Sequence, residues 1–166
     1  TKIVTYIEQG KYRLAIESAE EMYENSTTTS STDNKSNEKD RFSASCNALM
    51  CIGLANSEMG MLEEAMANYN ECISNIKSSE FVSQMLTQML EAETYRMQTA
   101  QKLSDKRRAL RVLDSYAESI EYFRKESVGT DFENAFIEDY ILLMNICYAD
   151  IYCDLNNPER ARHHIN

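Results

Sequence analysis

The side chains that could perform catalysis are few. The two histidines, His163 and His164, lie at the end of the chain, and no G-x-S-x-G motif provides a nucleophilic serine. The four glycines are isolated, so they build neither of the phosphate-binding loops G-x-x-x-x-G-K and G-x-G-x-x-G. Carboxylates are abundant, but a catalytic pair also needs burial in a cleft. The residue types therefore predict neither an enzyme nor a cofactor site.

A metal site is the second chemistry to consider, with Cys147, Cys153, His163 and His164 as the conceivable ligands. Cys147 and Cys153 are six residues apart, which separates them by about 240° on a helix of 3.6 residues per turn. Two thiols on different sides of a helix make a poor chelate. We expect no metal, and an unfamiliar catalytic or metal site inside a helical core is the least favoured interpretation.

The five cysteines, Cys46, Cys51, Cys72, Cys147 and Cys153, lie within apolar helical patterns and lack a C-x-x-C spacing. An odd, scattered set of this kind indicates reduced thiols in a cytoplasmic or nuclear protein rather than a disulfide framework. No run of about 18 apolar residues exists, and the start carries no charged-then-apolar leader. We therefore expect no membrane contact by this segment.

Composition and charge limit the fold class and the partner. Only four glycines and one proline among 166 residues favour an all-α protein. A chain of this length forms one domain that buries about 68–70% of its unfolded surface. The net charge of −10 argues against nucleic acid as the ligand, because phosphate binding needs a basic face. A basic or neutral protein or peptide is the expected partner.

Apolar periodicity and cap residues predict eight helices. Gly10, Gly60 and Gly129 serve as stops, Ser79 is a candidate N-cap, and Asn157 with Pro158 opens the last helix. The predicted ranges are 2–9, 11–24, 42–59, 61–78, 80–103, 106–124, 133–155 and a last helix from 158. The helix at 133–155 is apolar over most of its circumference, so it should be buried centrally or lie under an adjoining repeat or subunit.

Residues 25–40 differ from the rest of the chain in composition. Nothing apolar occurs between Ser26 and Asp40, and serine and threonine dominate. Such a segment cannot offset its ordering entropy by burial, so we expect a disordered insertion. A phosphorylation site and a merely tolerated insertion both fit, and the second is favoured.

Residues 45–76 carry the clearest pattern in the chain. The order reads Leu49-x2-Ile52-Gly53-x2-Asn56, followed by Ala65-x3-Tyr69. This resembles one tetratricopeptide repeat, whose signature is W-x2-L-G-x2-Y and then A-x3-F. Gly53 and Ala65 then sit where two helices cross closely.

Weaker copies surround this unit, as a repeat that cannot bury its own apolar face requires. The marker alanines Ala15, Ala65, Ala109 and Ala161 are 50, 44 and 52 residues apart, longer than the standard spacing of about 34. The resemblance therefore implies a long-helix variant: an all-α α-solenoid of about four antiparallel helix pairs, a superhelix like that of the tetratricopeptide repeat (TPR) family, over residues 1–166. The missing initiator methionine and the ending within a helix pair suggest a piece of a longer protein.

The resemblance also implies a mode of action, in which the first helix of each pair lines a concave groove for a partner peptide or helix. The expected groove residues are Asn47, Ser57, Glu58, Glu91, Thr94, Tyr95, Gln98, Gln101, Lys102, Asp150 and Asp154. The carboxylate clamp of chaperone-tail binders is absent, because Cys51, Glu91 and Tyr95 stand at the matching positions. The groove is then acidic to neutral and fits a basic or amide-rich ligand.

Two functions follow from these observations. The first is a non-catalytic scaffold or adaptor that binds a partner protein in the groove. The second is a structural or sensory segment of a larger protein or complex, which packs through the apolar helix at 133–155. Ordinary solvent exposure explains each single groove residue at least as well as partner binding does.

Overall fold

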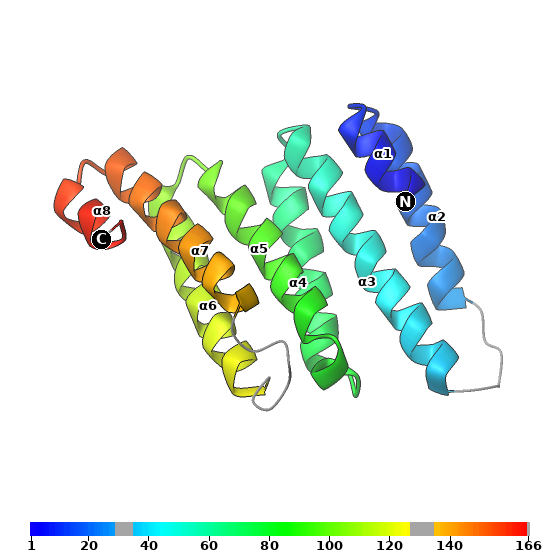
Figure 1. The fold of residues 1–166 in the computed structure, drawn as a ribbon. Helices are drawn as coiled ribbons and strands as arrows, with labels where there is room; N and C mark the ends of the chain where they lie inside the picture. The colour runs from blue at the N-terminus through cyan, green and yellow to red at the C-terminus, as the bar shows by residue number, and fades with distance from the viewer. Residues whose placement is uncertain (29–34, 127–134, 166) are drawn as a thin grey trace. The chain divides into compact units, whose positions relative to one another are not determined.

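The computed structural model describes residues 1–28, 35–126 and 135–165, and helices are the regular structure found there (Figure 1). The fold is all-α, with helices that follow one another as antiparallel pairs, as expected for a helical repeat. The chain divides into two compact units, Thr1–Tyr95 and Arg96–Asn166, and the division falls within one helix. A single domain over 1–166 therefore stays a prediction.

The first unit contains two complete helix pairs and the start of a fifth helix. Within this unit, α1, α3 and the start of α5 lie on one side, with α2 and α4 behind them (Figure 1). The elements are α1 (Lys2–Glu8), α2 (Tyr12–Thr28), α3 (Lys35–Glu58), α4 (Leu62–Ser78), the 3-10 helix η1 (Val82–Gln84) and α5 (Leu86–Gln101).

The second unit begins within α5 and continues through α6 (Lys106–Glu126), α7 (Ala135–Asp154) and α8 (Pro158–His163). Here α7 packs against both α6 and α8. Asn157 caps α8 as predicted, because its Oδ1 accepts a hydrogen bond from the Arg160 amide at 3.2 Å. Pro158 occupies the first turn, where its missing N–H costs nothing.

The same turn closes three helices. Gly10 and Gly60 have φ values of +69° and +78°, and Asn156 reaches +53° without being glycine. After each of them, an amide bonds back five residues: Lys11 to Tyr6, Met61 to Asn56 and Asn157 to Tyr152. This is the pattern of a left-handed helix cap, and it marks these three junctions as equivalent positions of a repeat.

Two predicted boundaries need correction. Ser79 does not start a helix but ends α4. Its hydroxyl donates to the Ile76 carbonyl and accepts from the Phe81 amide. The next α-helix, α5, begins only at Leu86. The helices also extend into the expected insertion, because α2 continues to Thr28 and α3 starts at Lys35.

The helical ends of the expected insertion are stabilised locally. Hydroxyls of Ser26, Thr27 and Thr28 donate to carbonyls one turn earlier, so polar residues can continue α2 without burying apolar surface. The rest of that segment, 29–34, lies outside the described residues, as do Gly129 and the predicted start of the seventh helix at 133.

The core confirms the marker alanines and the close crossing at Gly53. Ala15, Ala65, Ala109 and Ala161 are all buried. A Cβ placed on Gly53 would lie 2.5 Å from Cε1 of Tyr69, so only glycine lets the Tyr69 ring of α4 lie against the α3 backbone.

Replacing Gly53 with alanine should therefore destabilise the first unit. We expect Gly53→Ala to lower the free energy of unfolding by about 1 kcal/mol. Overpacking against Tyr69 costs about 2 kcal/mol, and the higher helix propensity of alanine offsets about 1 kcal/mol of this cost. Urea unfolding followed by circular dichroism measures this change. In a Tyr69→Leu background the same substitution should become neutral or stabilising, and an equal loss in both backgrounds would contradict the explanation.

Candidate interaction surfaces

In the first unit, Gln88 joins α3 to α5 and was missed by sequence reasoning. Its Nε2 donates to Asn47 Oδ1 at 2.6 Å and to the Ser43 carbonyl at 3.0 Å, while its Oε1 accepts from the Ser43 hydroxyl at 3.1 Å. Asn47, predicted to contact a partner, thus uses its amide oxygen to hold the two helices together. A glutamine in an amphipathic stretch carries no local signal for such a bridge.

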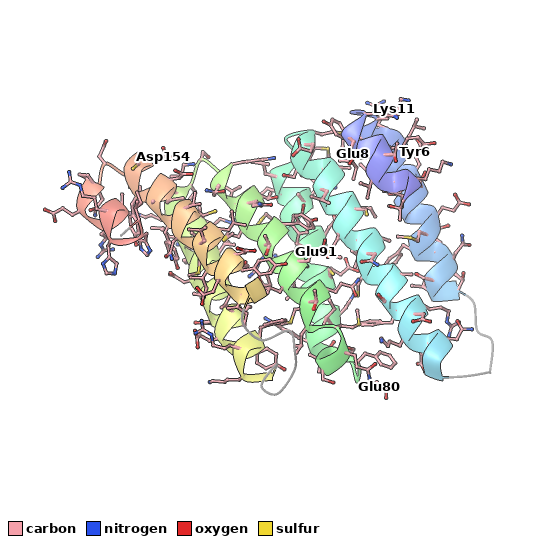
Figure 2. All side chains as sticks on the ribbon, viewed as in Figure 1. Tyr6, Glu8, Lys11, Glu80, Glu91 and Asp154 are labelled. Atoms are coloured by element: carbon pink, nitrogen blue, oxygen red, sulfur yellow. The ribbon has the colours of Figure 1, made fainter. Side chains whose placement is uncertain are left out.

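Farther along the same surface, Glu91, Tyr95 and Cys51 interact. The Tyr95 hydroxyl donates to Glu91 Oε1 at 3.1 Å, and the Tyr95 ring lies 6.2 Å from that of Tyr69. Burial raises the pKa of the Cys51 thiol, and the negative charge of Glu91 raises it further. Cys51 therefore stays protonated, and Glu91 provides the negative charge on this part of α5 (Figure 2). We call Asn47, Cys51, Gln88, Glu91 and Tyr95 the α3–α5 surface.

Three further predicted residues of this unit differ in accessibility. Ser57 and Thr94 are buried, and the Thr94 hydroxyl donates to the Leu90 carbonyl at 2.8 Å, so a partner would find little of either side chain. Their role in a partner-binding groove stays a prediction. Glu58 is the last residue of α3 and is exposed.

The remaining predicted residues belong to the second unit. Gln98 and Lys102 are exposed and Gln101 is half-buried, and the Gln101 carbonyl accepts from Lys106 Nζ at 2.8 Å. Lys106 Nζ also lies 3.2 Å from Asp154 Oδ2 at the end of α7 (Figure 2). The positive charge of Lys106 is thus neutralised by a carboxylate of the chain itself.

An aromatic cluster in the second unit fixes α8 on α7. The His164 ring stacks 4.6 Å from Tyr148 and 5.8 Å from Tyr152, and His164 Nδ1 lies 3.1 Å from Asn145 Oδ1. The Tyr148 hydroxyl donates to Asp114 Oδ1 at 2.6 Å. Burial, together with this carboxylate, raises the pKa of Tyr148, so the hydroxyl remains a donor.

Potential metal ligands and thiols are the remaining groups that could perform chemistry. Among residues 1–28, 35–126 and 135–165, no group of three or more His, Cys, Asp or Glu side chains could hold a metal ion. Burial and the nearby Asp150 raise the pKa of the Cys147 thiol to about 11, so this cysteine is protonated near neutral pH. No helix in the part of the chain that the structure describes is long and apolar enough to cross a membrane.

Comparison with known families agrees with this geometry. The tetratricopeptide repeat family profile matches residues 47–78, the second half of α3 through α4, a segment that includes Gly53 and Tyr69. Residues 47–78 thus match one tetratricopeptide repeat, and such a repeat indicates a general role in protein–protein interaction. Comparison with curated proteins and with solved structures gives no match.

Loss of the Gln88 bridge should loosen the α3–α5 surface. We expect Gln88→Ala to lower the free energy of unfolding by about 1–2 kcal/mol, because each lost hydrogen bond contributes about 0.5–1.5 kcal/mol. Asn47→Ala should cost less and should add almost nothing in the Gln88→Ala background. Urea unfolding measures the three variants, and strictly additive losses would show that the two amides do not act together.

The stability of the second unit should depend on the protonation of His164. Burial lowers the pKa of His164, and the neighbouring His163 lowers it further. The unfolded chain then binds the proton more readily, so stability is full above about pH 6.5 and falls as the pH drops toward the lower folded pKa. The free energy of unfolding should fall more between about pH 7.5 and pH 5.5 in the native chain than in His164→Phe. Equal pH dependence would exclude this role.

Proposed function

We propose that this chain is a non-catalytic scaffold or adaptor, which binds a partner peptide or helix on the faces of its first helices. The observation that carries the proposal is the α3–α4 repeat with the adjoining α3–α5 surface. There, Gln88 fixes the spacing of two first helices while Glu91 and Tyr95 remain accessible in part. A surface held in one arrangement loses little entropy on binding.

The charge of the accessible groups favours a basic or neutral partner. Glu58 and Asp150 are exposed, and Glu91 is half-buried, within a chain of net charge −10. Such carboxylates attract lysine or arginine side chains and steer their approach more than they add affinity. Lys102 is an exposed residue among the predicted partner contacts, and its charge is positive. A basic side chain of the partner would therefore be repelled near the end of α5.

A second function is favoured by a separate observation. Leu142 and Ile146 of α7 are exposed at 60% and 48% of their surface, and we expected this helix either to be buried centrally or to lie under an adjoining repeat or subunit. A structural segment of a larger protein or multi-subunit complex would cover them. This alternative predicts that the α3–α5 surface is not needed for assembly.

Charge reversal separates the two functions. Affinity capture from native extract, with Glu58→Lys plus Asp150→Lys as bait, should lose the partner that the native chain retains, because the reversed charges repel a basic ligand. Glu20→Lys plus Glu24→Lys on α2 makes the same charge change on exposed residues outside the proposed contacts and should retain the partner.

Two measurements make the capture experiment decisive. Circular dichroism checks that helicity is unchanged in both baits, and mass spectrometry identifies the retained protein. Retention of the same partner by both double variants would reject the groove and favour the structural segment.

A further inference from the structure

Two large apolar residues of α7 are exposed, although the helix packs against α6 and α8. Leu142 and Ile146 lie one helical turn apart, so they share a side of the helix. Other sides of α7 are occupied, because Tyr148 bonds to Asp114 of α6 and Asn145 contacts His164 beyond α8. Exposed leucine and isoleucine side chains on consecutive turns indicate a contact surface more than a solvated one.

Carboxylates stand at both ends of this stripe. Asp139 lies three residues before Leu142, and Asp150 lies four residues after Ile146, which places both on the same side of α7. Both are exposed, and within the described ranges neither forms an ion pair with a basic side chain. Asp154 differs, because it pairs with Lys106. We call Asp139, Leu142, Ile146 and Asp150 the α7 stripe.

We propose that the α7 stripe binds an amphipathic basic helix of a partner protein. This inference rests on the proposed function and specifies the partner's chemistry. The stripe extends over about 16 Å along the helix, at 1.5 Å per residue, which about three turns of a partner helix would cover. Apolar side chains at helical spacing would pack on Leu142 and Ile146, while a lysine or arginine near each end would pair with Asp139 or Asp150.

The charges argue against two other occupants. A second copy of the chain, placed symmetrically on the stripe, would bring like carboxylates together. An anionic membrane surface would repel the same carboxylates. A basic helix satisfies both the apolar centre and the acidic ends.

The test uses the whole chain and three synthetic peptides of about 18 residues. The first places leucines at i, i+3, i+4 and i+7 with lysines elsewhere, the second scrambles the same residues, and the third replaces lysine with glutamate. Fluorescence anisotropy measures the dissociation constant of each. We expect the amphipathic basic peptide to bind at least tenfold more tightly than either of the others, and to bind less tightly at high salt.

Variants of the chain locate the binding. Leu142→Gln plus Ile146→Gln should weaken binding of the first peptide at least tenfold, because polar side chains cannot replace the apolar contact. Asp139→Asn plus Asp150→Asn should weaken binding and reduce its salt dependence. Val4→Gln plus Leu14→Gln, which change comparably exposed apolar residues in the first unit, should leave the affinity unchanged. Circular dichroism confirms that each variant remains helical.

Several outcomes would overturn the inference. These are unchanged affinity of the Leu142 and Ile146 variant, equal binding of the scrambled or acidic peptide, or a dimer in sedimentation that this variant abolishes. The outcome for the proposed function is separate. If the Leu142 and Ile146 variant still captures the native partner that Glu58→Lys alone loses, the α7 stripe is rejected and the scaffold function stands.

Discussion

The close approach of Tyr69 to the backbone of Gly53 is the constraint on which the first unit depends. It sets the distance between α3 and α4, and other contacts follow from that distance. The Cys72 thiol donates to the Cys46 carbonyl at 3.5 Å, and the Asn56 amide donates to Asn68 at 3.2 Å. With α3 held in place against α4, one side remains for α5, where Gln88 completes the arrangement. The surface that we propose for binding therefore depends on a glycine that no partner touches.

A left-handed cap at the helix C-terminus recurs at three junctions of the described chain. Gly10, Gly60 and Asn156 end their helices in the same way, so each following helix returns antiparallel to the one before. The junction between α5 and α6 is different: Leu103 bonds back only three residues, to the Ala100 carbonyl, and Asp105 Oδ1 accepts from the Arg108 amide instead. The junction between α5 and α6 therefore lacks the left-handed cap found at the other three junctions.

Only part of the chain's negative charge is available to a partner, because several carboxylates form ion pairs or hydrogen bonds within the fold. Asp154 neutralises Lys106, Glu91 accepts from Tyr95, and Asp114 accepts from Tyr148. Burial and neighbouring charge keep Cys51 and Cys147 protonated, so the thiols behave as apolar side chains. The carboxylates that remain exposed, such as Asp139 and Asp150, are the ones that can attract a basic partner.

Local sequence patterns were enough to predict the helical class, the repeat at residues 45–76 and the turns at Gly10 and Gly60, because periodicity and backbone conformation are local properties. The tertiary structure decided which predicted contacts are accessible. Ser57 and Thr94 became buried, Asn47 joined α3 to α5 through Gln88, and Leu142 with Ile146 remained exposed. The bond between Asn47 and Gln88 joins residues that are 41 positions apart. Local spacing carries no information about which distant side chain will cover a given face.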